Sequence, residues 1–128
     1  MARILIIDDD EAVRNATKIA LEANGFDVVA VADGKSGILE IQNRNFDAVI
    51  VDLFMPGMDG LETTKAIRGL NPHMPIIAAS GFMFGGSCPE MPNFQEMAEE
   101  AGAISVLYKP FRPKDLLQTV YKALAVSV

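Results

Sequence analysis

The sequence lacks several features that would place it in other classes of protein. It has a single cysteine, Cys88, among 128 residues, so it cannot form an internal disulfide, which favours a reducing, cytoplasmic setting. No run of about 18 apolar residues could cross a membrane, and the first residues resemble a strand rather than a signal peptide. Basic residues are scarce, since 11 lysines and arginines face 17 acidic residues. The resulting net charge of −6 disfavours binding to nucleic acid, because affinity for phosphates depends on lysine and arginine.

Short apolar runs alternate with amphipathic stretches along the whole chain. Half of the residues are hydrophobic, which is enough for the core of one domain of this length. The predicted strands cover residues 4–7, 26–31, 48–51, 76–79 and 104–107. The predicted helices cover residues 12–24, 35–44 and 60–69, and two more begin near Asn93 and Pro113. The apolar face predicted for the first helix carries Ala12, Ala16, Ile19 and Ala23. Four of the strands are continuous apolar runs, as a parallel sheet covered by helices on both faces requires.

Polar side chains follow four of the five predicted strands. Asp8, Asp9 and Asp10 follow the first strand, Asp52 the third, Ser80 the fourth and Lys109 the fifth. In open α/β sheets the ligand site lies beyond the carboxyl ends of the strands. Carboxylates gathered there repel one another unless a cation neutralises them, and Mg²⁺ is a cation that takes oxygen ligands and a phosphate. Asp52 is therefore the candidate nucleophile; Lys109 could pair with it, and Ser80 could donate a hydrogen bond to a phosphoryl oxygen.

Four motifs, "ILIIDDDE", "VDLFMPGMDGLE", "IIAASG" and "LYKPF", resemble in order the receiver domain of two-component response regulators. The resemblance implies a flavodoxin-like (βα)5 fold in which Asp52 accepts a phosphoryl group. It further implies that Mg²⁺ is bound directly by Asp9, through water by Asp8, and also by Asp52 and the backbone carbonyl of Phe54. Ser80 and Lys109 match the hydroxyl and lysine positions of the family, whose members often hold the Lys-Pro bond in cis.

The resemblance also implies a function for the chain as a whole. We expect residues 1–128 to form a single receiver domain without an output domain. It would take its phosphoryl group from a histidine kinase or a histidine phosphotransfer protein, with Mg²⁺ as cofactor, and signal through a protein partner. It would be an acceptor that assists its own phosphorylation rather than an enzyme that turns over substrate. Neither nucleic acid nor a membrane is an expected partner.

Three departures from the family pattern bear on output and on signal lifetime. The segment of residues 81–93 is longer than usual and rich in Gly, Pro, Met and Phe, so it could contact a partner or fold over the core. Val106 stands where the family usually has an aromatic switch residue. Phe54 and Phe82 stand at the positions that flank the phosphoryl group. Neither can orient a water molecule, which predicts slow self-dephosphorylation.

Several of these residues also have simpler interpretations, and two other functions fit parts of the sequence. Asp10 and Asp59 are expected to serve only the starts of the helices that follow them, and His73 is expected at the surface. A haloacid-dehalogenase-type phosphatase would use Asp8 as nucleophile and Asp10 as acid/base, but would leave the segment around Asp52 without a role. A third alternative is a receiver-like binding module that acts without phosphorylation.

Overall fold

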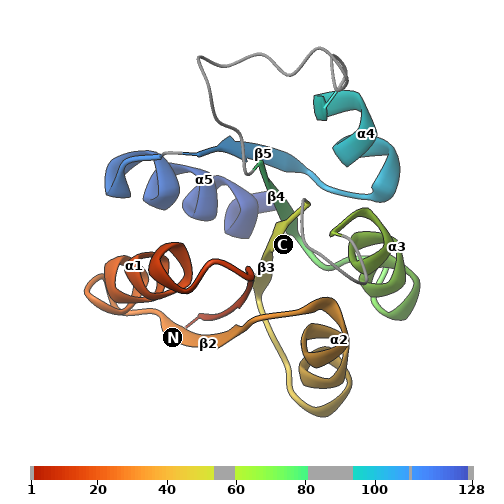
Figure 1. Ribbon diagram of the computed structural model, residues 1–128, viewed down its shortest axis with the longest axis horizontal. Coiled ribbons are helices and arrows are strands. Elements are labelled where there is room, and N and C mark those ends of the chain that lie inside the picture. The colour runs from red at the N-terminus through yellow and green to blue at the C-terminus, as the bar shows by residue number, and fades with distance from the viewer. Residues whose placement is uncertain (1, 54–59, 81–93, 110, 127–128) are drawn as a thin grey trace.

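The computed structural model describes residues 2–53, 60–80, 94–109 and 111–126 (Figure 1). Strands and helices alternate along this part of the chain, and every predicted element is present within two residues of its predicted ends. The first half contains β1 (Arg3–Ile7), α1 (Glu11–Glu22), β2 (Asp27–Val31), α2 (Gly34–Asn43) and β3 (Ala48–Asp52). The second half contains α3 (Gly60–Leu70), β4 (Ile76–Ser80), α4 (Phe94–Ala101), β5 (Ser105–Tyr108) and α5 (Pro113–Val126).

The strands form one parallel sheet in the order β2-β1-β3-β4-β5. This confirms the predicted flavodoxin-like α/β architecture. The chain runs from β1 outward to β2 and then returns to the other side of β1, so the order reverses between β1 and β3. In doubly wound sheets such a reversal opens a crevice at the carboxyl ends of the strands, and ligands bind there.

Helices cover both faces of the sheet and bury a separate core on each (Figure 1). Side chains alternate between the two faces along a strand. In β1, Leu5 and Ile7 enter the core under α2, α3 and α4, whereas Ile4 and Ile6 enter the core under α1 and α5. Burial on both faces explains why the three central strands, β1, β3 and β4, are almost continuously apolar.

The predicted apolar face of α1 is not the face that packs on the sheet. Ile19 is 67% exposed, and Ala12, Ala16 and Ala23 are exposed as well. The buried residues of this helix are Thr17 and Leu21. The Thr17 hydroxyl donates a hydrogen bond to the Val13 carbonyl within the helix (2.8 Å), which removes the cost of burying a polar group. The predicted face was wrong because it was assigned from Ala12, Ala16, Ile19 and Ala23, whereas the buried face carries Thr17 and Leu21.

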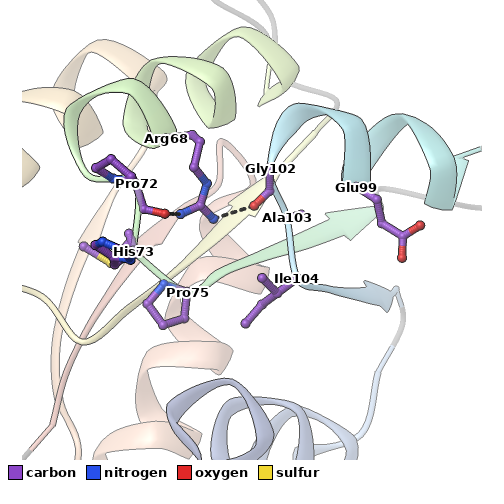
Figure 2. Close-up of a pocket in the computed structure, with 9 residues that line it drawn as sticks. Arg68, Pro72, His73, Pro75, Glu99, Gly102, Ala103 and Ile104 are labelled. Atoms are coloured by element: carbon purple, nitrogen blue, oxygen red, sulfur yellow. Dashed lines mark hydrogen bonds between the residues drawn. The ribbon is translucent and has the colours of Figure 1, made fainter. Parts of the chain in front are cut away.

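Arg68, near the end of α3, ties together two turns at the amino-terminal edge of the sheet (Figure 2). Its guanidinium donates hydrogen bonds to the carbonyl of Pro72 (2.7 Å) in the turn before β4 and to the carbonyl of Gly102 in the turn before β5. These turns border an open hollow of about 430 Å³, which His73 also lines. His73 is exposed, as the sequence predicts.

Replacing Arg68 by methionine should lower the free energy of unfolding by about 2 kcal/mol, because it removes charge-assisted hydrogen bonds to two turns at once. Urea unfolding of the two proteins measures the difference. Arg112→Met is the matched control, since among the described residues Arg112 forms an ion pair only with Asp115, three residues away, and its side chain is 76% exposed. Such surface pairs contribute little. Equal stability losses in the two variants would contradict the structural role of Arg68.

Candidate functional site

The register of the sheet brings Asp8 and Asp52 side by side. β1 and β3 are neighbours, and Ile7 pairs with Val51, so the next residue of each strand stands at the same level of the carboxyl edge. Asp52 is 3% exposed and Asp8 is 4% exposed. Two carboxylates this deeply buried require cationic partners, because removing charges from water is costly.

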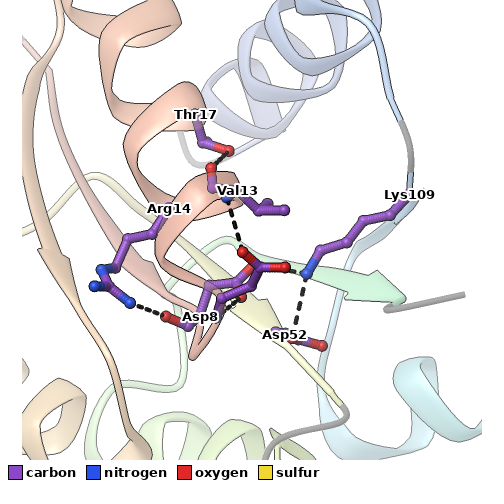
Figure 3. A network of polar contacts seen from close by, with 7 residues as sticks. Asp8, Val13, Arg14, Thr17, Asp52 and Lys109 are labelled. Carbon is purple, nitrogen blue, oxygen red and sulfur yellow. Dashed lines mark hydrogen bonds and ion pairs between the residues drawn. The ribbon is translucent and has the colours of Figure 1, made fainter.

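Lys109 supplies one positive charge to both carboxylates (Figure 3). It follows β5, and its side chain extends past the end of β4 to reach β1 and β3. Its Nζ lies 2.7 Å from Oδ2 of Asp8 and 3.2 Å from Oδ2 of Asp52. The predicted pairing of Lys109 with Asp52 is therefore present, but Asp8 is the nearer partner.

The two carboxylates keep Lys109 charged over a wide pH range. Burial disfavours the ammonium form, but the hydrogen bonds and negative charges of Asp8 and Asp52 outweigh this, so the pKa of Lys109 is raised above 10.5. A raised pKa means that the folded protein holds this proton more tightly than the unfolded chain does. The contribution of the charged Lys109 to the stability of the fold is therefore fully present below pH 10.5. It is lost as the pH rises through the pKa that Lys109 has in the folded protein.

Each polar group of Asp8, in its side chain and its backbone, has a hydrogen-bond partner. Oδ1 of Asp8 accepts a hydrogen bond from the backbone N–H of Asp10 (2.9 Å), while Oδ2 accepts from Lys109. Its backbone N–H donates to the carbonyl of Val31 at the end of β2 (3.1 Å). Its own carbonyl accepts from Nη1 of Arg14, one turn into α1 (2.9 Å). Arg14 did not emerge from the sequence as a site residue, because an arginine on a helix is usually a solvated charge.

Asp9 completes a cluster whose chemistry suits Mg²⁺. One carboxylate oxygen each from Asp8, Asp9 and Asp52 lies within 4.8 Å of the others. Hard oxygen ligands of this kind are what Mg²⁺ prefers. Three carboxylates against the single ammonium of Lys109 leave an excess of two negative charges, which one divalent cation would neutralise. The residues present therefore fit a Mg²⁺ ion.

Asp10 has the role of a helix cap, as the sequence predicts. Its side chain accepts a hydrogen bond from the backbone N–H of Val13 (3.2 Å) at the start of α1. An N-cap carboxylate of this kind satisfies an otherwise unpaired helix donor. This engagement offers no support for Asp10 as the acid/base of a phosphatase.

The structure describes some of the remaining predicted site features only in part. Ser80 is the last residue of β4, where it pairs with Tyr108, so its backbone lies at the same edge of the sheet. Val106 is half-buried and packs against the core under α2, α3 and α4. The metal-binding carbonyl predicted for Phe54, the flanking Phe82, the capping Asp59, the long segment 81–93 and the predicted cis bond to Pro110 lie outside the described residues.

The strand order and the site together define a class of protein. It is a doubly wound parallel α/β domain in which a buried aspartate at the topological reversal, Asp52, lies beside two further acidic residues and contacts a lysine. Comparison with known proteins identifies the family. The family model for the response regulator receiver domain matches residues 4–121, and the chain belongs to this family. Phosphoryl acceptance is general in the family, and its members bind Mg²⁺ at an acidic pocket.

Curated relatives share the domain but are longer proteins. Response regulator MprA of Mycobacterium sp. (strain KMS) is 34% identical over 115 residues, which are 90% of this chain and 47% of that protein. Transcriptional regulatory protein ZraR of Salmonella typhimurium (strain LT2) is 33% identical over 122 residues, which are 95% of this chain and 26% of that protein. The chain thus spans about half the length, or less, of these relatives.

Solved structures of similar length have the same fold. The chemotaxis protein CheY4 of Vibrio cholerae is 32% identical, with a TM-score of 0.86 covering 97% of this chain and 99% of that one. A CheY-like receiver domain protein from Methanospirillum hungatei is 31% identical, with a TM-score of 0.88 covering 99% of this chain and 96% of that one. In the described part of this chain, no helix has the length and apolar character needed to span a membrane.

The position of Lys109 predicts competition between its ammonium and Mg²⁺. The ammonium occupies Oδ2 of Asp8, so a metal at the cluster gains less from that carboxylate than it would otherwise. The Lys109→Met variant should bind Mg²⁺ on the order of ten-fold more tightly, a change of about 1.4 kcal/mol. Calorimetric titration measures the affinity, and Lys114→Met, which removes an exposed lysine of α5, is the control. Unchanged affinity in Lys109→Met would contradict the competition.

Proposed function

We propose that this chain is a phospho-accepting signalling receiver. Asp52 would take its phosphoryl group from a phosphohistidine on a histidine kinase or histidine phosphotransfer protein. One observation carries the proposal: the buried carboxylate of Asp52 lies at the carboxyl edge of the sheet, 3.2 Å from the ammonium of Lys109 and beside Asp8 and Asp9. The residues that would serve as nucleophile, as cation for the transferred group and as metal ligands thus lie within one cluster.

The proposed reaction is a direct transfer between the two proteins. A carboxylate oxygen of Asp52 attacks the phosphorus, forming an acyl phosphate. The bond from phosphorus to the donor imidazole nitrogen breaks, its electron pair returns to that nitrogen, and a proton from water neutralises the imidazole. No other oxidant, reductant or co-reactant is required.

The residues around Asp52 would assist by placing charge where the phosphoryl group arrives. Lys109 would move its ammonium from the Asp52 carboxylate to a phosphoryl oxygen, and the Ser80 hydroxyl would donate to another, as the family resemblance implies. Asp9 and Asp52 would hold Mg²⁺ directly and Asp8 through water. When bound, the metal neutralises negative charge on the carboxylates and the phosphoryl group.

The same proposal includes the setting of the reaction. The chain would act in the cytoplasm as an acceptor rather than as a turnover enzyme. It would pass its signal to a protein partner. Its low content of basic residues supports a protein target over nucleic acid.

Mass spectrometry of the intact protein tests the proposal. After incubation with Mg²⁺ and a small acyl phosphate as donor, we expect the mass to rise by one phosphoryl group, and peptide mapping should place the group on Asp52. A chelator should abolish the gain, because the excess negative charge of the cluster repels an anionic donor. Absence of any gain with Mg²⁺ and donor present would favour the binding module that acts without phosphorylation.

A further inference from the structure

The three acidic residues of the cluster are not held in the same way. Asp8 and Asp52 are buried, and both carboxylates contact Lys109. Asp9 is exposed, and within the described ranges its carboxylate makes no hydrogen bond or ion pair to another side chain or to the backbone. The backbone that carries Asp9 therefore sets where its side chain begins, and no contact with another described residue holds the carboxylate itself.

That backbone is fixed by Arg14. The peptide unit between Asp8 and Asp9 is planar, so the direction of the Asp8 carbonyl determines where the N and Cα atoms of Asp9 lie. Nη1 of Arg14 donates to this carbonyl oxygen at 2.9 Å (Figure 3). The N–H of Asp8, which belongs to the preceding peptide unit, donates to the carbonyl of Val31. β2 therefore holds the peptide unit before Asp8, and Arg14 holds the unit after it.

We propose that Arg14 is a positioning residue for the metal site, which it serves by orienting the Asp8–Asp9 peptide so that the Asp9 carboxylate faces those of Asp8 and Asp52. This inference rests on the proposed binding of Mg²⁺. Among the described residues Arg14 forms no ion pair with a carboxylate, so its contact here is with the backbone. If Arg14 acted through its charge alone, replacing it would strengthen Mg²⁺ binding, because a nearby guanidinium repels Mg²⁺. If Arg14 orients the peptide, replacing it should weaken Mg²⁺ binding.

Calorimetric titration of the whole chain with Mg²⁺ separates the two roles. Arg14→Met should bind Mg²⁺ about ten-fold more weakly, the usual loss when a residue that orients a metal ligand is removed. Lys18→Met is the matched control, since it removes the same charge from the same helix one turn further on, and its affinity should be unchanged or slightly higher. Affinity in Arg14→Met equal to or above that of the parent would overturn the proposal.

A double-mutant cycle with Asp9→Asn shows whether Arg14 acts through Asp9. If it does, adding Arg14→Met to Asp9→Asn should weaken Mg²⁺ binding much less than it weakens the parent, because the ligand that Arg14 positions is already lost. If the losses of Mg²⁺ affinity in the two single variants add fully in the double variant, Arg14 does not act through Asp9 and the proposal is overturned. Arg14→Lys, which keeps the charge but not the planar guanidinium, covers the case in which Arg14→Met fails to fold.

Arg14→Lys should still lose several-fold in affinity, and full affinity in this variant would overturn the proposal. Failure of the parent chain to bind Mg²⁺ would instead remove the proposed metal site together with this inference. Normal binding by the parent with no effect of Arg14 removes the inference alone. The two failures are thus distinguishable in one set of titrations.

Discussion

In the Asp52→Asn variant, the mass gain from an acyl phosphate and Mg²⁺ is expected to disappear completely. An amide oxygen carries no negative charge and is a poor nucleophile, whereas the size and shape of the side chain are almost unchanged. The fold should survive, because Lys109 keeps its nearer partner, Asp8, at 2.7 Å. The loss would therefore report on chemistry rather than on unfolding, which thermal denaturation of the variant can verify.

The Asp10→Asn variant is the matched control for this experiment. Asp10 lies next to the cluster in sequence, but its side chain caps α1, and asparagine is an equally good cap. This variant should be phosphorylated like the parent. The alternative phosphatase scheme makes the reverse prediction, since it requires Asp8 and Asp10 and leaves Asp52 without a role. Phosphoryl labelling that persists in Asp52→Asn at another residue would rule out the acceptor assignment.

Replacing Gly60 by alanine is expected to cost about 3 kcal/mol of unfolding free energy or more. Gly60 is the buried first residue of α3, and its N–H donates to the carbonyl of Leu53 (3.2 Å). A Cβ at this position would overlap the carbonyl oxygen of Asp52 and the Cα of Leu53. Both are backbone atoms, so either the end of β3 or the start of α3 must move. A shift of β3 would also displace Asp52 and slow phosphorylation.

Gly69→Ala, in the same helix, provides the control for this substitution. A Cβ at Gly69 meets no heavy atom within 4 Å, and alanine favours a helix over glycine by up to about 1 kcal/mol. We therefore expect this variant to be as stable as the parent or slightly more stable. Urea unfolding of both variants measures the difference. Similar stabilities for the two would show that the close approach at Gly60 is relieved without cost.

Many residues of the site could be predicted from the sequence, because the ends of the apolar runs indicate where the strands end. Each of the four polar positions follows a continuous apolar run, and parallel strands align such positions at one edge. The observed clustering of Asp8, Asp9 and Asp52 was therefore predictable. The capping role of Asp10 was predictable too, because it depends only on the residues immediately after it.

Packing details were not predictable, because they depend on groups brought together from distant parts of the chain. Thr17 is polar in sequence but buried in α1, since its hydroxyl is satisfied within the helix. The clash that constrains Gly60 depends on how closely α3 approaches the backbone of β3. Neither fact has a signal in residue type or periodicity.

The sequence by itself determined the parallel α/β fold, the edge of the sheet that carries the site and the acidic and basic residues gathered there, because these follow from the pattern of apolar runs and the residues that end them. Only the tertiary structure decided that Lys109 lies closer to Asp8 than to Asp52 and that Arg14 holds the Asp8 carbonyl. Differences of less than an ångström and the direction of a long side chain arise from the packing of whole elements, which residue order alone does not express.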